Sequence, residues 1–315
     1  MSRVLVTGGG GFIGSNLTEA WLGAGHDVCV LDDFSTGRRS NLARAADWAL
    51  AGRATFELLE GDIRDPATCH RAMAGVDFVL HQAAIPSVQR SVRDPLSTHA
   101  VNATGTLNLL EAARASGVRR FVFASSSSVY GESEVLPKVE TMAPAPISPY
   151  GLQKLAAETY CILYHRLFGL PTVALRYFNV FGPRQDPTSE YSAVIPRFLG
   201  AALRGGRPTI YGDGEQSRDF TFVGDVVRAN QNACSAGPGA LGRAYNIACG
   251  GRISLNALLA EIGRQTGKQL EADHVAPRPG DIRHSLAAID AARERLGFRP
   301  QVGLSEGLAR TIEAF

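Results

Sequence analysis

The pair of residues best able to do chemistry in this 315-residue chain is Tyr150 and Lys154, four positions apart in the stretch ISPYGLQK. Ser148 suits the N-cap of a helix and Pro149 suits its first position, so the sequence predicts a helix that begins here. That helix sets both side chains on one face, one turn apart. A lysine ammonium beside a phenol stabilises the phenolate, whose ordinary pKa is about 10. Tyr150 is therefore a candidate general base.

Four adjacent serines, residues 125–128, form a second group of reactive side chains. They follow the apolar run RRFVFA, which reads as a strand, so they lie at its carboxyl end. Ligands of open parallel sheets bind at that end of the strands. Neutral hydroxyls can hydrogen-bond a reacting oxygen, but they cannot deprotonate a carbon at a useful rate. The segment therefore predicts hydrogen bonding to a substrate rather than acid or base catalysis of its own.

A glycine-rich turn near the N-terminus indicates a nucleotide site. The stretch VTGGGGFIG holds a GxxGxxG frame between a predicted strand and helix, formed by Gly8, Gly11 and Gly14. Such a turn brings backbone N–H groups close to a pyrophosphate at the helix N-terminus. Asp32 ends the next strand, at about the spacing where an acidic residue binds the adenosine ribose. Its carboxylate repels a 2′-phosphate, which favours NAD over NADP, whereas Arg38 and Arg39 could accept that phosphate.

The elements that must position these groups alternate along the chain. Short β-rich runs are each followed by an amphipathic stretch as far as about residue 180. This alternation predicts an α/β fold with a Rossmann-type doubly wound parallel sheet. Beyond that point Pro and Gly interrupt the pattern, which predicts a smaller mixed α/β C-terminal lobe. We expect residues 1–178 to bind the dinucleotide and residues 179–315 to form the substrate lobe, with 221–249 returning to the first domain.

Composition excludes several classes of partner. The chain has 32 basic and 30 acidic residues, a net charge of +2 and no long run of like charges. We therefore expect neither a nucleic acid nor a membrane as partner. The start resembles no signal peptide and no long apolar span follows, so a cytoplasmic location is expected. The five cysteines form no CxxC pair, which predicts reduced thiols and no metal site.

Together these motifs resemble the extended short-chain dehydrogenase/reductase family, and within it the NAD-dependent nucleotide-sugar epimerases. The resemblance rests on the glycine turn, GDIRD at 61–65, HQAA at 81–84, VNATGT and the Tyr-Lys motif. It implies NAD as cofactor. The cofactor-binding residues that it implies are Gly8, Gly11, Phe12, Ile13, Gly14, Asp32, Asp33, Ser35, Thr36, Gly37, Asp62, Ile63, Gln82, Ala83, Ala84, Asn102, Tyr150, Lys154 and Tyr177. For Asn102, a buried and hydrogen-bonded helix residue is an equal alternative.

The resemblance also implies a catalytic set of Ser126, Tyr150 and Lys154. Ser126 would hydrogen-bond the reacting sugar oxygen, so its replacement should slow the reaction far more than replacement of Ser125. Relatives that dehydrate nucleotide-sugars carry Asp and Glu where this chain has Ser127 and Ser128, and UDP-glucuronate decarboxylases carry Glu at the latter position. The absence of an acid here favours an isomerase that only oxidises and reduces one carbon.

Motifs of the looser lobe resemble those of UDP-sugar 4-epimerases. They are RYFNVFGPRQDP, AVIPRF, TIYGDGEQSRDFTFVGDV and RPGDIRHSL. By resemblance Tyr211 stacks on uracil, Arg218 and Arg278 hold the diphosphate, and Asn179 contacts the diphosphate or sugar. The implied substrate-binding residues are Ser87, Ser127, Ser128, Asn179, Val194, Ile195, Tyr211, Arg218, Arg278 and Ser285.

The substrate that this resemblance implies is a UDP-sugar, with UDP-GlcNAc and UDP-GalNAc interconverted through a 4-keto intermediate. Ser285 stands where a large tyrosine in UDP-glucose 4-epimerases excludes an N-acetyl group, and a gate of this kind discriminates weakly, so UDP-Glc and UDP-Gal are expected too. Pro86 and Ala288 depart from the residues common in the family.

The sequence leaves two alternative functions open, and the resemblance also implies an oligomeric state. A UDP-glucuronate 4-epimerase shares the fold and the serine-rich segment 125–131, which we call the serine loop. Such enzymes often have Thr where this chain has Asn179. A catalytically silent NAD-binding regulator would tend to lose Tyr150 or Lys154, which this chain keeps. Relatives pair through helices corresponding to 94–116 and 150–168, which implies a homodimer.

Overall fold

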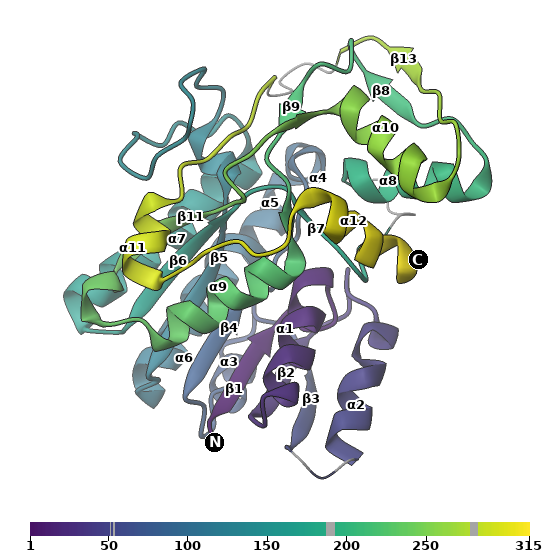
Figure 1. The fold of residues 1–315 in the computed structure, drawn as a ribbon. Helices are drawn as coiled ribbons and strands as arrows, with labels where there is room; N and C mark the ends of the chain where they lie inside the picture. The colour runs from purple at the N-terminus through teal and green to yellow at the C-terminus, as the bar shows by residue number, and fades with distance from the viewer. Residues whose placement is uncertain (51, 53, 187–192, 278–282) are drawn as a thin grey trace.

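The main body of the computed structural model, which describes residues 1–50, 52, 54–186, 193–277 and 283–315, is built on one parallel sheet. The strand order is β11-β6-β5-β4-β1-β2-β3, and every neighbouring pair is parallel. The strands are β1 (Arg3–Thr7), β2 (Asp27–Asp32), β3 (Phe56–Glu60), β4 (Phe78–His81), β5 (Arg120–Ser126), β6 (Thr172–Tyr177) and β11 (Arg243–Ile247). The expected doubly wound Rossmann-type sheet is confirmed (Figure 1).

Helices cover both faces of this sheet because its central strands are apolar on both sides. In β1, Val4 and Val6 belong to one buried cluster and Leu5 to the other. The first cluster packs against α1 (Phe12–Gly23), α2 (Ala43–Leu50), α9 (Val223–Ser235) and α11 (Asp290–Leu296). The second packs against α3 (Pro66–Ala72), α6 (Thr106–Ser116) and α7 (Pro149–Phe168). Alternating burial on two faces is what a covered parallel sheet requires.

Shorter segments connect these helices and strands. They are α4 (Val88–Arg93), α5 (Pro95–His99), the π-helical η2 (Ala100–Gly105) and the 3-10 turns η1 (Arg39–Leu42), η3 (Ser127–Tyr130) and η4 (Pro238–Ala240).

A smaller lobe lies above the carboxyl ends of the strands (Figure 1). Its helices are α8 (Val194–Arg204), α10 (Leu255–Thr266) and α12 (Leu304–Glu313). Its strands pair only two by two: β7 (Val180–Phe181) with β10 (Thr221–Phe222), β8 (Thr209–Tyr211) with β13 (Asp273–Val275), and β9 (Ser217–Arg218) with β12 (Ile253–Ser254). A third buried cluster, which includes Phe198, Leu258 and Leu308, forms its core. The smaller mixed α/β lobe is therefore present as expected.

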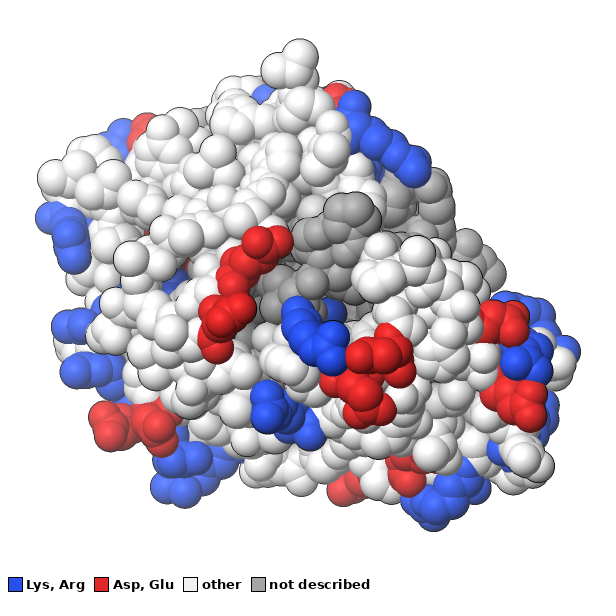
Figure 2. Space-filling view, turned by 90° about the horizontal axis from the view of Figure 1, so that it is seen from above, with Lys and Arg blue, Asp and Glu red and all other residues white. Residues whose placement is uncertain are grey.

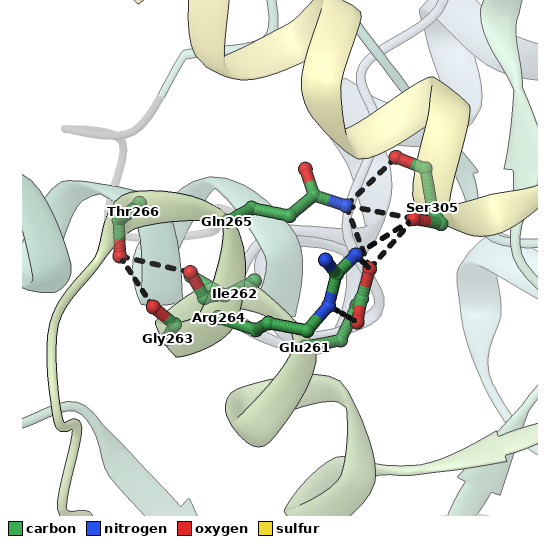
Figure 3. A network of polar contacts seen from close by, with 7 residues as sticks. All are labelled: Glu261, Ile262, Gly263, Arg264, Gln265, Thr266 and Ser305. Atoms are coloured by element: carbon green, nitrogen blue, oxygen red, sulfur yellow. Dashed lines mark hydrogen bonds and ion pairs between the residues drawn. The ribbon is translucent and has the colours of Figure 1, made fainter.

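Polar contacts join two helices of this lobe (Figure 3). Ser305 at the start of α12 donates to Glu261 of α10 over 2.7 Å, and Gln265 donates to the Ser305 carbonyl over 2.8 Å. Hydrogen bonds from Arg264, Ser305 and Gln265 lower the pKa of Glu261 to about 2. The carboxylate therefore stays charged and holds α12 on α10 throughout the neutral range.

Segments from late in the chain return to the main sheet. Helix α9 lies on its first face, and β11 pairs with β6 so that Asn246 lies opposite Arg176. Helix α11 belongs to the same buried cluster as α9. The division into domains at residue 178 stays a prediction.

Charge is mixed on the face seen from above, where described basic and acidic side chains both occur (Figure 2). All five cysteines are free thiols, and four of them are buried. Among the described residues, no helix has both the length and the apolar character needed to cross a membrane.

Candidate active site

A cavity of about 570 Å³ lies at the carboxyl ends of the main strands. The predicted cofactor residues that line it are Gly8, Gly11, Phe12, Ile13, Gly14, Asp32, Asp33, Ser35, Thr36, Asp62, Ile63, Gln82, Ala83, Ala84, Tyr150, Lys154 and Tyr177. The other two predicted cofactor residues, Gly37 and Asn102, do not line this cavity. Gly37 packs against the Gly10 backbone, and the Asn102 side chain bonds the Ile85 backbone over 2.8 Å and Gln153 over 2.9 Å. The buried, hydrogen-bonded alternative therefore describes the contacts of Asn102.

The glycine turn is closed so tightly that side chains do not fit. Gly8 has φ +70°, and a Cβ there would lie 2.7 Å from the Ala83 backbone. A Cβ on Gly14 would lie 2.1 Å from the Gly8 carbonyl oxygen. Helix α1 begins at Phe12 without a side-chain cap, so its first N–H groups are available to an anion in the cavity.

Asp32 is fixed at the cavity wall by the turn that it faces. Its two oxygens accept backbone N–H groups from Gly10 and Phe34, each over 2.8 Å. Burial raises the pKa of Asp32, and these two bonds oppose that rise. A carboxylate has about four acceptor sites. Two of these are used, and the others suit the hydroxyls of a ribose.

The two arginines that could accept a 2′-phosphate already have carboxylate partners. Arg38 pairs with Asp186 at 2.6 Å, and Arg39 pairs with Glu60 and lies 4.3 Å from the Phe34 ring centroid. These pairings weaken the case for NADP.

Gln82 gives a direct sign that the cavity suits a polar ligand. Its Nε2 donates to the Tyr177 hydroxyl over 3.3 Å, and Asn230 donates to the same hydroxyl over 2.9 Å. Its Oε1 is buried and has no hydrogen-bond partner among the described residues. A buried acceptor without a partner is unfavourable. A donor such as the carboxamide of a nicotinamide would satisfy it, so these residues fit a dinucleotide.

Helix α7 carries the predicted base at its first turn. Ser148 accepts the Gly151 N–H over 3.1 Å, and Pro149 is the first helical residue, as the sequence predicts. Ser91 of α4 accepts the Tyr150 N–H over 3.0 Å. Two side chains thus cap this helix N-terminus and hold Tyr150 at the cavity wall.

Lys154 lies one turn further along α7, with its Nζ donating to the Ala124 carbonyl over 3.0 Å. Burial lowers the pKa of Lys154 to about 8. Burial also raises the pKa of Tyr150, and a hydrogen bond with Ser126 only partly offsets the rise. The chain alone therefore keeps the phenol protonated near neutral pH. The structure brings Ser126, Tyr150 and Lys154 together.

The four serine hydroxyls differ in their contacts. Ser125 is buried and donates to Glu158 over 2.6 Å. Ser126 is half-buried, and its oxygen accepts from the Ser128 N–H over 3.2 Å and from the Ser128 hydroxyl over 2.9 Å. Ser127 and Ser128 are half-buried in the turn η3. Ser125 lines the cavity although it is largely buried, whereas the other three serines are half-buried and are not among the residues that line it.

A second cavity of about 230 Å³ lies under the smaller lobe, and Ala193 lines both cavities. Of the predicted substrate residues, those that line it are Asn179, Val194, Ile195, Tyr211 and Arg218. Asn179 has φ +32° and donates to the Asp219 carbonyl over 3.1 Å. The second cavity thus adjoins the first at the edge of the lobe.

The other predicted substrate residues lie apart from this wall. Ser87 lines the first cavity and caps α4 with φ +96°. Ser285 donates its N–H to the Ser217 carbonyl over 3.0 Å, next to the strand that carries Arg218. Arg278 lies outside the described residues.

Several lining residues were not among the sequence-based predictions. Arg184 lines the first cavity and is anchored to Ser15 over 3.0 Å and to Glu19 over 2.7 Å. Arg197 and Gln216 line the second cavity. All three occur in quoted motifs, but only the fold turns them toward the cavities. The roles of individual residues stay predictions.

A glycine turn, an acidic strand end and a Tyr-Lys pair around one cavity define a dinucleotide-dependent enzyme on a Rossmann-type sheet. The chain belongs to the NAD dependent epimerase/dehydratase family, whose model matches residues 4–248, and NAD is its cofactor.

Its relatives match along almost the whole chain. The UDP-glucose 4-epimerase of Mycolicibacterium smegmatis is 42% identical, over 99% of this chain and 98% of the relative. A solved UDP-N-acetylglucosamine 4-epimerase from Methanobrevibacter ruminantium, in complex with UDP-N-acetylmuramic acid, has a TM-score of 0.92 and 37% identity, over 99% of this chain and 97% of the other. The UDP-glucose 4-epimerase of Thermotoga maritima with UDP-glucose has a TM-score of 0.91 and 39% identity, over 99% and 98%.

Proposed function

We propose that this protein is a UDP-sugar 4-epimerase that interconverts UDP-GlcNAc and UDP-GalNAc and also accepts UDP-Glc and UDP-Gal. The observation that carries the proposal is that Tyr150 and Lys154 line the first cavity while Ser126 hydrogen-bonds Tyr150, in a serine loop without an acidic residue. The names of the relatives, which include UDP-glucose and UDP-N-acetylglucosamine 4-epimerases, support the same reaction.

In this proposal the chain moves one proton and holds the sugar. Tyr150 takes the proton of the sugar 4-hydroxyl while Ser126 hydrogen-bonds the same oxygen. NAD, when bound, supplies the hydride acceptor and later the hydride donor at C4. Lys154 stays charged below a pH of about 8 and favours the Tyr150 phenolate. After the 4-keto sugar has turned over in the pocket, Tyr150 returns its proton to the oxygen, so protons and electrons balance.

Ser285 supports the choice of acetamido sugars. By the resemblance it stands where a large tyrosine would exclude an N-acetyl group, and size gates discriminate by only about 1–3 kcal/mol per group. We expect Ser285→Tyr to lower the kcat/KM for UDP-GlcNAc relative to UDP-Glc. The same substitution at Ser235, exposed at the end of α9, is the control.

One observation favours UDP-glucuronate as a second candidate substrate. Arg90 lines the first cavity, and its charge acts on the neighbouring Asp94, whose pKa it helps to lower. A guanidinium of this kind suits a carboxylate. Against this reading, the resemblance leaves Asn179 where uronate epimerases often have Thr.

The test is to incubate the protein with UDP-GlcNAc, UDP-Glc, UDP-Gal and UDP-glucuronate in turn and to identify the products. The cofactor that copurifies is identified by mass spectrometry. Formation of UDP-GalNAc from UDP-GlcNAc with bound NAD is expected. Turnover of UDP-glucuronate alone would transfer the proposal to the second candidate. If all four sugars remain untouched, the silent NAD-binding regulator is the better reading.

We also propose a homodimer, formed through 94–116 and 150–168. Large apolar side chains are exposed on these helices, among them Leu96, Leu152, Leu167 and Phe168. Apolar patches of this kind mark interaction surfaces. Light scattering during size exclusion should give twice the chain mass, and Leu167→Asp should shift it toward the monomer. A cytoplasmic location also stays a prediction.

A further inference from the structure

A buried ion pair lies beneath the serine loop. Glu158 of α7 and Arg176 of β6 form two parallel contacts, from Nη2 to Oε1 over 2.6 Å and from Nε to Oε2 over 3.0 Å. Their side chains are only 2% and 5% exposed. A buried pair needs further hydrogen bonds to offset the loss of water. The partners that supply these bonds show what the pair holds in place.

Both ends of the serine loop bind this pair. Ser125 donates to Glu158 Oε2 over 2.6 Å, and Arg176 Nη1 donates to the Tyr130 hydroxyl over 2.7 Å. Ser126, the residue next to the substrate in the proposed mechanism, lies between these two anchors. The loop is therefore held at its entry and its exit by one rigid group.

The same pair ties the loop to the catalytic helix. Tyr150, Lys154 and Glu158 follow one another at intervals of four along α7, so they share one face of that helix. Ser125 and Arg176 are direct register partners in the adjacent strands β5 and β6. The position of Ser126 relative to Tyr150 is thus set through Glu158.

The network continues from Tyr130 toward the end of the chain. The Tyr130 hydroxyl donates to Asn246 Oδ1 over 2.7 Å, and Asn246 Nδ2 donates to the carbonyls of Lys138 over 3.0 Å and Ala288 over 3.1 Å. Tyr130 therefore has a donor and an acceptor partner at once, and its hydroxyl is locked in direction.

We propose that the Glu158–Arg176 pair, through Ser125 and Tyr130, positions Ser126 against the Tyr150 hydroxyl, an inference that rests on the proposed epimerase reaction. These four are positioning residues, because their polar groups are engaged with one another and act through the loop.

Arg176 and Tyr130 keep their protonation states while Tyr150 titrates. Burial acts to lower the pKa of Arg176, but the hydrogen bonds and charge of Glu158 outweigh burial and raise it. Burial raises the pKa of Tyr130, so its phenol stays neutral. A change in the pH profile of kcat would therefore report on the environment of Tyr150.

The test removes one anchor at a time, with Ser125→Ala and Tyr130→Phe. Each variant is expected to lower kcat about 10-fold, since small displacements of a positioned group slow catalysis strongly, while KM stays at its wild-type value. Copurified NAD should also be unchanged in Tyr130→Phe, because Tyr130 does not line the first cavity. The apparent pKa of the pH profile should rise as the Ser126 bond to Tyr150 weakens. In the double variant the loss should be smaller than the product of the single losses, because both anchors hold one loop.

Tyr245→Phe is the matched control. Tyr245 is a fully buried tyrosine of β11 whose hydroxyl donates to the Ala240 carbonyl over 3.0 Å, away from the serine loop. It should lose stability like Tyr130→Phe but keep the wild-type kcat and pH profile. Equal losses of kcat in the control and the loop variants would overturn the proposal, because the network would then only stabilise the fold.

Hydrogen–deuterium exchange separates this inference from the proposed function. Amides of residues 126–131 should exchange faster in Ser125→Ala and Tyr130→Phe than in the wild type or Tyr245→Phe. Unchanged exchange in both loop variants would refute the positioning role, whatever the substrate. Faster exchange in a protein that epimerises no UDP-sugar would instead refute the proposed function and leave the anchoring of the loop standing.

Discussion

The two cavities are built in different ways although they share Ala193. The first lies at the ends of long strands of one sheet, and part of its wall is the glycine turn, where an added Cβ at Gly8 or Gly14 would meet backbone. The second lies among two-stranded pieces and α8, and its wall includes the side chains of Arg197, Tyr211 and Arg218. A wall of backbone is hard to alter by substitution, whereas a wall of side chains changes with each one. We therefore expect the first cavity, the predicted cofactor half, to tolerate fewer substitutions than the second cavity, the predicted substrate half.

Tyr150, which lines the first cavity, should give the largest effect. Tyr150→Phe removes the hydroxyl that moves the proton, and the expected loss of kcat is about 1,000-fold. Copurified NAD should remain, because the ring still lines the cavity. Tyr160→Phe, an exposed position on the same helix, should keep full activity in the same assay. A Tyr150→Phe enzyme with near wild-type kcat would remove Tyr150 from the mechanism.

Asp32 tests the cofactor half alone. Asp32→Asn keeps the shape of the side chain but removes the charge that is predicted to bind a ribose. Because hydrogen bonds to charged groups are stronger than those to neutral groups, we expect the NAD affinity to fall about 100-fold. Calorimetric titration of the stripped protein with NAD measures this. KM for the UDP-sugar at saturating NAD should stay unchanged. Asp47→Asn, at an exposed carboxylate of α2, is the control. Unaltered NAD affinity in Asp32→Asn would place the ribose elsewhere.

Burial of His81, at the end of β4 beside the first cavity, should make the stability of the protein depend on pH. It is buried between the hydroxyls of Thr7, at 2.7 Å, and Thr106, at 2.9 Å, and burial lowers the pKa of His81 to about 3. The unfolded chain therefore binds more protons between pH 6.5 and 3, and the free energy of unfolding falls as the pH falls through that window. The expected loss at pH 5 is about 2 kcal/mol relative to pH 7.

Urea unfolding of the wild type and of His81→Gln at both pH values measures this contribution. The difference between the two proteins should change by the stated amount, whereas His274→Gln, at an exposed lobe position, should show no such change. If the difference in free energy of unfolding between the wild type and His81→Gln were the same at both pH values, folding would not lower the pKa of His81.

Arg218 tests the substrate half and should give the smallest effect. Arg218→Gln removes one charge from a wall that other side chains also form, and the expected rise in KM for the UDP-sugar is about 10-fold. NAD affinity and kcat should stay at wild-type values. Arg264→Gln, an exposed site on α10, is the control. If Arg218→Gln instead weakened NAD binding, the separation into two halves would be wrong.

The sequence predicted the cofactor half well because its signals are local. The strand–turn–helix of the glycine loop and the cap and proline before Tyr150 each lie within a few residues, and short-range sterics and hydrogen bonding decide them. The alternation of strands and helices was likewise enough for the fold class. For the substrate half, motif resemblance named five of the residues that line the second cavity, but neither Arg197 nor Gln216.

By itself, then, the sequence determined the doubly wound sheet and the NAD family, since each follows from periodicity or from a motif of fixed spacing. It also predicted Ser126, Tyr150 and Lys154 as a catalytic trio, by resemblance. Only the tertiary structure decided that Ser125 donates to the buried Glu158 while Ser126 hydrogen-bonds Tyr150. That distinction depends on the register of β5 with β6, which places Arg176 opposite Ser125. Residues 51 positions apart meet through strand pairing, and strand pairing is a property of the assembled sheet, which no short stretch of sequence records.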